Sequence, residues 1–212
     1  MDPFSEAAVR GAYDAVADDY ARTFGDDLER LPLDRELLDA AADDAPRGWV
    51  LEAGCGPAPA ARHLAGHAAP VVGLDVSAAM LAVARARCPG LQVLEGNLRQ
   101  LPLRDACCGL VVAMYCLHNL ARRDVPRALE EIHRVLVGAG VLLVSTHLGT
   151  GDVVVEEFLG HRVPAVGGAL YERDEILELV TTAGFAVERE EHRDPLAHEH
   201  PTERIYVVLR AA

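Results

Sequence analysis

Short apolar runs alternate along this chain with segments in which apolar residues recur at helical spacing. Five runs are short enough to be buried strands, and they occupy residues 49–51, 71–74, 91–94, 110–113 and 141–144. The segments with helical spacing between them are residues 59–64, 77–87 and 124–136. Strands that alternate with helices in this way predict an α/β fold built around a parallel sheet.

Capping residues mark the ends of these helices. Ser77 and Asp124 stand where a side-chain oxygen can accept a hydrogen bond from the first turn of a helix. Gly138 and Gly140 follow the last helix, and glycine is common where a helix ends. We therefore expect the two glycines to separate the helix at 124–136 from the strand at 141–144.

The C-terminal part of the chain changes its pattern. Residues 174–183 have helical spacing, whereas residues 185–190 and 205–209 are strand-like runs. Only residues 194–203 separate these two runs, which predicts an antiparallel hairpin at the edge of the sheet. The complete prediction is an α/β, Rossmann-like fold: a seven-stranded, mostly parallel sheet with a terminal antiparallel hairpin and helices on both faces.

The remaining segments surround this predicted core. Residues 5–20 and 33–42 have helical spacing and are expected to cap a ligand cleft, and the glycine-rich residues 149–170 have the character of an insertion. We predict one domain over residues 1–212. Its parts are an N-terminal helical lid (1–45), a cofactor-binding core (46–148), a substrate-side insertion (149–170) and a C-terminal helix and hairpin (171–212).

Composition narrows the class of protein. A chain of 212 residues, half of them hydrophobic, can bury one sizeable core, and it has no apolar run long enough for a membrane span. The acidic N-terminus without a following apolar run predicts a cytoplasmic protein. The net charge of −13 disfavours nucleic acid as a partner. The five cysteines form no CxxC pair, and Cys107 and Cys108 are interpreted as small apolar core residues.

The first predicted strand runs into a glycine-containing turn. Gly54 and Gly56 carry no Cβ, so a ligand can approach the backbone closely at the carboxyl end of this strand. Asp75 ends the second predicted strand, where its carboxylate can accept hydrogen bonds from the ribose hydroxyls of an adenosine. A dinucleotide fingerprint requires a third glycine where this chain has Pro59, and proline lacks the amide that a pyrophosphate needs. A nicotinamide-dependent reductase is therefore disfavoured.

These residues belong to a longer series of motifs. The series comprises Glu52-Ala53-Gly54-Cys55-Gly56, Gly73-Leu74-Asp75-Val76-Ser77, Gly96-Asn97-Leu98 followed by Leu101-Pro102-Leu103, and Leu117-His118-Asn119. In this order it resembles the class I S-adenosylmethionine-dependent methyltransferases, in particular small bacterial enzymes with a methyltransferase domain of type 11 or 25. The resemblance covers nearly the whole chain. It implies S-adenosylmethionine as the cofactor. The spacing of the cysteines and histidines gives no metal-ligand set, so no metal ion is expected.

The resemblance also assigns roles to individual residues. It implies that Glu52 supports the methionine amino end, that Asp75 holds the ribose and that Met80 flanks the adenine. An acid normally contacts the adenine amine where this chain has Asn97, whose carbonyl can still accept that hydrogen bond. The complete set of expected cofactor-binding residues is Tyr20, Glu52, Gly54, Cys55, Gly56, Asp75, Val76, Met80, Asn97, Leu98 and Met114.

Histidines at the ends of two predicted strands are candidate catalytic groups. His118 follows the fourth strand and His147 follows the fifth, so either could take a proton from an acceptor. The pair His63 and His67 lacks a third metal ligand and is expected to face solvent, and residues 198–200 are interpreted as a polar turn. Arg122 and Arg123 could attract an acidic substrate, although the solvated start of a helix is the simpler interpretation.

The leading hypothesis is transfer of a methyl group from S-adenosylmethionine to an oxygen, nitrogen or carbon atom of a small molecule. The alternative is a protein that binds S-adenosylmethionine without methyl transfer, as a structural partner or for another reaction on a small metabolite. We expect a small-molecule substrate, no nucleic acid or membrane partner, and a monomer or a homodimer. The acceptor itself has no sequence signature.

Overall fold

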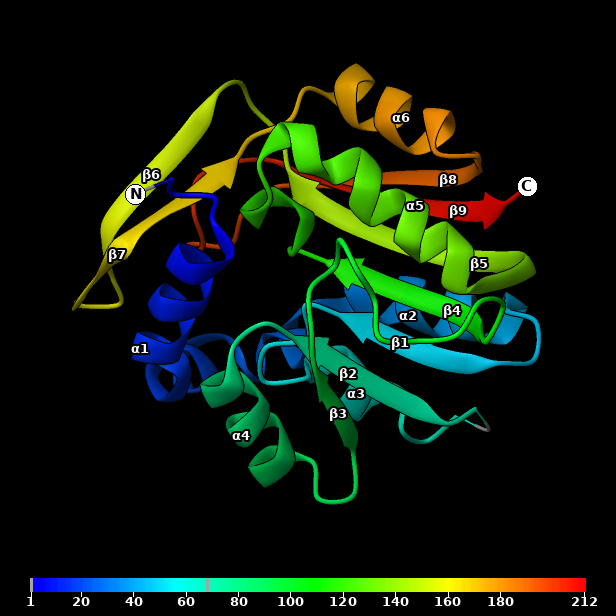
Figure 1. Ribbon diagram of the computed structural model, residues 1–212, viewed down its shortest axis with the longest axis horizontal. Coiled ribbons are helices and arrows are strands. Elements are labelled where there is room, and N and C mark those ends of the chain that lie inside the picture. Colours follow the sequence, from blue (N-terminus) through cyan, green and yellow to red (C-terminus); the bar gives the residue numbers. More distant parts are fainter. Residues whose placement is uncertain (1, 68) are drawn as a thin grey trace.

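A computed structural model describes residues 2–67 and 69–212. Seven strands form one twisted sheet in the order β3-β2-β1-β4-β5-β9-β8 (Figure 1). The pairs from β3 to β5 are parallel, and β9 pairs antiparallel with both β5 and β8. The strand bounds are β1 Trp49–Ala53, β2 Val71–Asp75, β3 Gln92–Glu95, β4 Cys108–Met114, β5 Leu136–His147, β8 Phe185–Arg193 and β9 Arg204–Ala211. The predicted fold class and terminal hairpin are confirmed.

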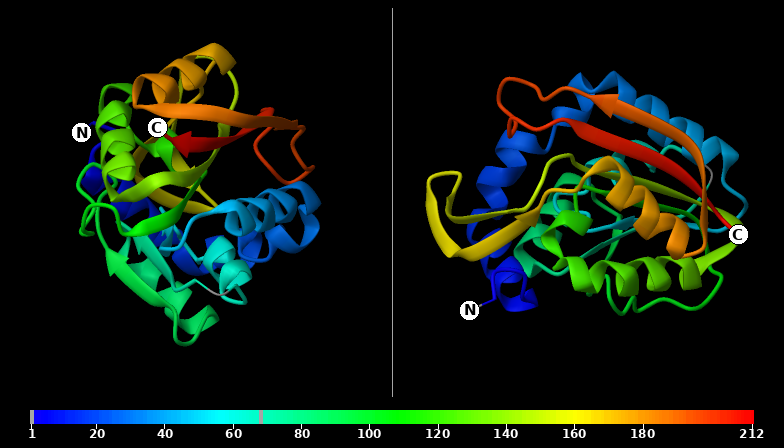
Figure 2. Two further views of the ribbon diagram at one scale, coloured as in Figure 1. Left: turned by 90° about the vertical axis from the view of Figure 1, so that its right-hand side faces the viewer. Right: turned by 90° about the horizontal axis from the view of Figure 1, so that it is seen from above.

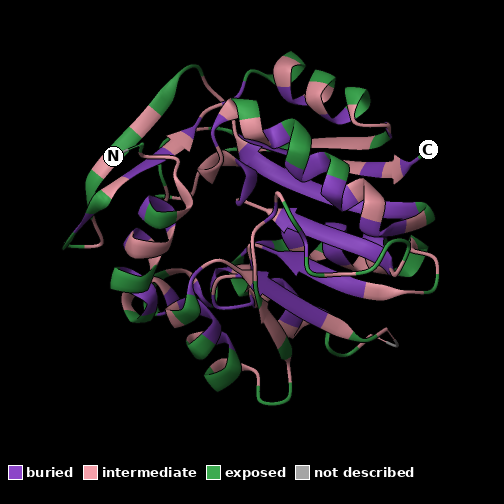
Figure 3. Ribbon diagram, in the orientation of Figure 1, coloured by how far each residue is buried: buried purple, intermediate pink, exposed green. Residues whose placement is uncertain are grey.

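Helices cover both faces of the sheet (Figures 1 and 2). One core lies between the sheet and α5 and α6, and it includes Leu51, Val111 and Ile132. A second core lies between the opposite face and α2 and α3, and it includes Val50 and Leu38. Figure 3 shows the resulting buried centre of the sheet between partly exposed helices. The helix bounds are α2 Pro32–Asp44, α3 Pro59–Leu64, α4 Ala78–Arg87, α5 Val125–Val135 and α6 Arg173–Thr182.

The N-terminal helix α1 (Glu6–Phe24) crosses the carboxyl ends of the strands rather than packing on a sheet face. Asp14 on α1 accepts hydrogen bonds from the Ser77 hydroxyl (2.6 Å) and the Ala79 amide (3.1 Å) at the start of α4. The expected capping of the cleft therefore describes α1. Helix α2 packs on the sheet and brings only Asp34 and Leu38 to the cleft.

The glycine-rich segment expected at 149–170 is a second, two-stranded antiparallel sheet of β6 (Asp152–Phe158) and β7 (His161–Ala169). Its inner face packs on α1, where Val163 and Val166 join Val9 and Val16 in an apolar cluster. A Cβ on Gly167 would lie 2.5 Å from the tip of the Phe4 ring, so a larger residue there would displace that ring. The sequence reasoning missed both strands.

The predicted helix at 124–136 is confirmed with Asp124 as its N-cap residue, but the predicted roles of Asp124 and of the two following glycines are wrong. Asp124 precedes α5 but does not cap it with its side chain, because its carboxylate accepts a hydrogen bond from Arg99 instead (3.1 Å). Helix α5 ends at Val135, and Gly138 and Gly140 lie within the first part of β5. There the ladder to β4 is irregular, so the glycines form a bend of the strand and not a helix end. Ser77 does cap α4, since its Oγ accepts from the Met80 amide.

Two interpretations of side-chain burial also need correction. His63 and His67 are half-buried rather than turned to solvent, and His63 Nε2 lies 2.7 Å from the Asp39 carboxylate on α2. Cys108 is buried at the start of β4, whereas Cys107 precedes the strand and is only half-buried.

Among residues 2–67 and 69–212, none of the helices combines the length and the apolar character needed to cross a membrane.

Candidate functional site

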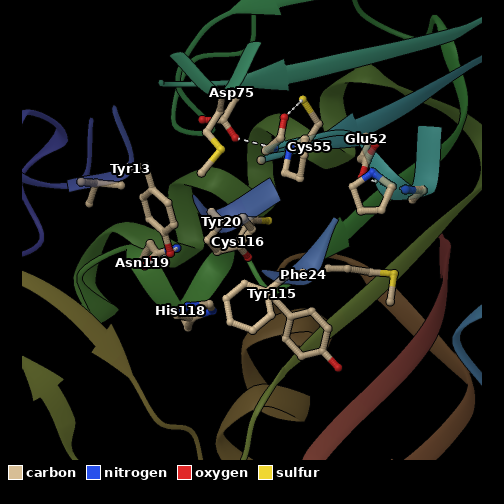
Figure 4. Close-up of a pocket in the computed structure, with 18 of the residues that line it drawn as sticks. Tyr13, Tyr20, Phe24, Glu52, Cys55, Asp75, Tyr115, Cys116, His118 and Asn119 are labelled. Carbon is tan, nitrogen blue, oxygen red and sulfur yellow. Dashed lines mark hydrogen bonds between the residues drawn. The ribbon is translucent and has the colours of Figure 1, made fainter. Parts of the chain in front are cut away.

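A cleft of about 640 Å³ opens at the carboxyl ends of β1, β2, β4 and β5, beneath α1 (Figure 4). Ligands of open α/β sheets bind at this edge, where neighbouring helices diverge to opposite faces. Every residue predicted for the cofactor or for catalysis lines this one cleft: Tyr20, Glu52, Gly54, Cys55, Gly56, Asp75, Val76, Met80, Asn97, Leu98, Met114, His118 and His147. The fold therefore brings together residues that are up to 127 positions apart in the chain.

The turn after β1 owes its shape to two glycines with positive φ. Gly54 has φ +66°, and a Cβ there would lie 2.4 Å from Cys116 Cβ. Gly56 has φ +49°, but a Cβ there would meet only Met80 Sδ, at 4.0 Å. Gly54 is thus required by packing within the protein. Gly56 leaves open space in the cleft that a ligand can fill.

Asp75 holds this turn from the end of β2. Its two carboxylate oxygens accept hydrogen bonds from the Gly56 and Ser77 amides, each at 2.8 Å. Burial raises the pKa of Asp75, while the amide hydrogen bonds oppose that shift. A carboxylate has about four acceptor positions, so this one retains capacity for hydroxyl donors from the cleft.

Glu52 lies at the floor of the cleft and caps α3. Its carboxylate accepts hydrogen bonds from the Ala60 (3.2 Å) and Ala61 (2.7 Å) amides. The residue at the helix N-cap, Ala58, has no side-chain acceptor, so Glu52 satisfies amides that would otherwise be unpaired. Burial raises the pKa of Glu52 to about 8.

This shift predicts a pH dependence of folding stability. The folded-state pKa of about 8 exceeds the ordinary value of 4.5, so the folded state binds the extra proton between these values. The contribution of Glu52 to the free energy of unfolding should therefore fall as pH rises through this range, with a slope of up to about 1.4 kcal/mol per pH unit for this one proton. Urea melts of the wild type and Glu52→Gln from pH 6.5 to 8.5 measure the slope. Parallel curves would contradict the assignment.

The range from pH 6.5 to 8.5 distinguishes the effect of Glu52 on stability from that of Asp34, which is also a buried acid. Burial raises the pKa of Asp34 to about 6, so Asp34 affects the slope mainly below this range. Asp34→Asn is the matched control and should retain the wild-type slope above pH 6.5.

The two candidate catalytic histidines are neighbours at the far end of the cleft. His118 lies in the short helix η2 (Leu117–Asn119) after β4, His147 ends β5, and their ring centres are 5.2 Å apart. The His147 ring also contacts the Thr202 hydroxyl, at 2.8 Å from Nδ1. Burial lowers the pKa of His118 to about 4 and that of His147 to about 3. Both rings are therefore neutral near pH 7.

Other cleft residues were missed from the sequence. Phe24 lines the cleft because α1 runs four residues beyond the predicted end at Tyr20, and its helical spacing from Tyr13 and Tyr20 was a usable signal. His198 and His200, expected in a polar turn, line the cleft as well. His198 reaches it by contacting Asp27 in η1 (Asp27–Arg30), at 2.9 Å, and local sequence carries no sign of this long-range contact.

Arg122 and Arg123 lie outside the cleft and form contacts elsewhere. Arg122, in the short helix η3 (Arg122–Asp124), donates to the carbonyls of Gly151 and Leu170 and pairs with Glu175, so it fastens the base of the β6–β7 hairpin to α6. Arg123 pairs with Asp2 (2.8 Å). Within the described part of the chain, no three His, Cys, Asp or Glu side chains come together as a metal site.

Comparisons with known proteins agree with this site. Residues 51–144 match the family model described as a methyltransferase domain. A probable S-adenosylmethionine-dependent methyltransferase of Mycolicibacterium smegmatis is 38% identical over 144 residues, which cover 66% of this chain and 52% of the relative. A malonyl-[acyl-carrier protein] O-methyltransferase of Pectobacterium atrosepticum is 33% identical over 146 residues, or 68% of this chain and 54% of the relative. The chain thus spans about half the length of these curated relatives.

A solved structure of similar fold comes from Methanosarcina mazei and is described as a SAM-dependent methyltransferase. It aligns with a TM-score of 0.69 at 15% sequence identity, covering 79% of this chain and 94% of that one. The matched segment, residues 51–144, holds the glycine turn, Asp75 and the Asn97 region. Residues 51–144 thus form a methyltransferase domain, and the motifs and sheet order of the chain are similar to those of class I S-adenosylmethionine-dependent methyltransferases.

Proposed function

We propose that this protein transfers a methyl group from S-adenosylmethionine to a small-molecule acceptor. The observation that carries the proposal is the single cleft in which the Gly54–Gly56 turn and Asp75 lie at one end and His118 and His147 lie at the other. Such a cleft holds a donor and an acceptor side by side beneath a helix that excludes water.

The residues at the donor end fit the proposed cofactor. Gly56 leaves room beside the backbone, and the Asp75 carboxylate has acceptor capacity for ribose hydroxyls. Glu52 lines the same cleft, and a positively charged methionine end beside it would favour the ionised form of its carboxyl group. When bound, S-adenosylmethionine supplies an electrophilic methyl group on a sulfonium. The chain's own task is to align the acceptor's lone pair with that methyl carbon.

The residues at the acceptor end suit a mainly apolar molecule with one polar group. Phe24, Leu31 and Tyr115 are apolar parts of the cleft lining, and the Tyr115 ring centre lies 5.4 Å from that of His147. The acceptor's lone pair would bond to the methyl carbon in place of the carbon–sulfur bond, whose electron pair would stay on sulfur. An acceptor with an N–H or O–H must then lose a proton, and a neutral His118 or His147 can accept it. A carboxylate acceptor, as the malonyl relative's name suggests for that protein, would need no base.

Cofactor binding and turnover test this function separately. Isothermal titration should show heat with S-adenosylhomocysteine, and a panel of phenols, amines and carboxylic acids including malonyl thioesters should yield a methylated product with one acceptor class. Binding without released S-adenosylhomocysteine across the panel would favour the alternative of a binding protein that does not methylate. Absence of binding by folded protein would refute both.

For an accepted phenol or amine, His118→Ala and His147→Ala should each lower kcat by about 100-fold if that ring takes the proton. The wild-type rate should stay flat from pH 6 to 8, because both ring pKa values lie below this range. His200→Ala, in the same cleft but outside this pair, is the comparison variant. Unchanged kcat in both ring variants would remove the histidines from catalysis and leave alignment alone.

A further inference from the structure

The adenine end of the cleft contains a carboxylate that the family's usual pattern does not supply. Glu6, on the first turn of α1, lines the cleft together with Val76, Asn97 and Leu98. Its carboxylate oxygen Oε2 accepts a hydrogen bond from the Asn97 side-chain amide, although the two residues are 91 positions apart. A negative charge thus lies beside the position at which this chain lacks the common acid.

The side chain of Asn97 has no acceptor capacity to spare. Its Oδ1 accepts from the Arg99 backbone amide (2.9 Å) and from Arg99 Nε (3.2 Å), and a carbonyl oxygen has two lone pairs. The orientation of the amide is fixed by its partners, because Arg99 offers only donors to one end and Glu6 offers only an acceptor to the other. The expectation that the Asn97 carbonyl receives the adenine amine therefore conflicts with these contacts.

Glu6 does have capacity to spare. Its Oε1 accepts from Arg10 at 3.0 Å and its Oε2 accepts from Asn97, which uses two of about four acceptor positions. Arg99 Nη2 lies 3.7 Å from Oε2, which is beyond hydrogen-bond distance, while Arg99 Nε donates to Asn97 Oδ1. Arg10 in turn donates to the Val76 carbonyl, so the Glu6 carboxylate is held at the wall of the cleft.

We propose that Glu6, carried by the lid helix, accepts the hydrogen bond from the exocyclic amine of the cofactor's adenine, with Asn97 as the residue that positions it. The proposal rests on the proposed function, since it concerns the same cofactor. It makes the lid helix part of the cofactor site, so donor binding and the position of α1 depend on each other.

Equilibrium binding of two probes tests this role without any need for an acceptor. S-Adenosylhomocysteine carries the amine, whereas S-inosylhomocysteine has an oxygen in its place. The wild type should prefer the adenosyl form, and Glu6→Gln should lose about tenfold of that preference, the effect of one charge-assisted hydrogen bond. Glu95→Gln is the matched control, because Glu95 also pairs with Arg10 (3.4 Å) from the exposed end of β3. It should keep the wild-type preference.

The charge swap gives a result that a merely structural role would not produce. Asn97→Asp alone places a second carboxylate against Glu6 and should weaken binding of S-adenosylhomocysteine. In the Glu6→Gln background the same change should restore binding and the preference for the amine, because the acid is then in the common position. Wild-type binding with an unaltered preference in Glu6→Gln would overturn this inference alone. Failure of the folded wild type to bind either probe would overturn the proposed function.

Discussion

Replacing Asp75 with alanine is expected to lower the affinity for S-adenosylhomocysteine by about 100-fold or more. Two charge-assisted hydrogen bonds to ribose hydroxyls would be lost, at about 1.5–3 kcal/mol each, and every 1.4 kcal/mol is a factor of ten. The loop would also lose the carboxylate that accepts from the Gly56 and Ser77 amides at 2.8 Å. Isothermal titration below the melting temperature of the variant measures the loss.

A paired comparison separates the ribose contact from the support of the loop. The wild type should bind S-adenosylhomocysteine more tightly than its 2′-deoxyribose analogue, while Asp75→Asn should bind the two almost equally. Asp14→Asn is the control, because Asp14 is a neighbouring carboxylate that accepts a hydrogen bond from the Ser77 hydroxyl. This variant should keep the wild-type ratio of the two affinities. If Asp75→Asn also keeps that ratio, the carboxylate does not hold the ribose.

The second large effect concerns Gly56. Gly56→Ala should lower the affinity for S-adenosylhomocysteine about ten- to one-hundredfold, since the new methyl group occupies space that the ligand needs and overpacking costs about 1–3 kcal/mol. The fold should remain, because the nearest atom to such a Cβ is Met80 Sδ at 4.0 Å. The strain at φ +49° adds only about 1–2 kcal/mol to the folding cost.

Gly54→Ala should behave in the opposite way. Its Cβ would lie 2.4 Å from Cys116 Cβ, so the variant should lose thermal stability whether or not ligand is present. Thermal melts with and without S-adenosylhomocysteine distinguish the two cases. Equal ligand stabilisation of Gly56→Ala and the wild type would show that the space beside Gly56 is not used by this ligand.

The sheet was predictable because its central strands are buried on both faces. Such strands are continuous apolar runs, and the runs at 49–51 and 110–113 proved to be parts of β1 and β4. The β6–β7 hairpin lacked this signal, since Val154 is half exposed and charged residues interrupt the run. Its inner face is buried only by α1, a contact between distant segments that no local pattern records.

The candidate site was predictable as a set of residues and less so in its internal contacts. The motifs located Glu52, Asp75 and Asn97 at strand ends, and the topology brings those ends to one cleft. That Glu52 caps α3 depends on amides eight and nine positions away across a turn. The contact between Glu6 and Asn97 depends on how the lid is seated, which in turn depends on packing against β7.

The seating of the first residues has a practical consequence for expressing the protein. The Pro3 carbonyl accepts a hydrogen bond from the Gly167 amide (2.9 Å), and the Phe4 ring lies over the same glycine. A purification tag that displaces Pro3 or Phe4 would remove these contacts with the hairpin. The opposite terminus follows β9 on the far side of the molecule (Figure 1), so a fusion placed there lies away from these contacts.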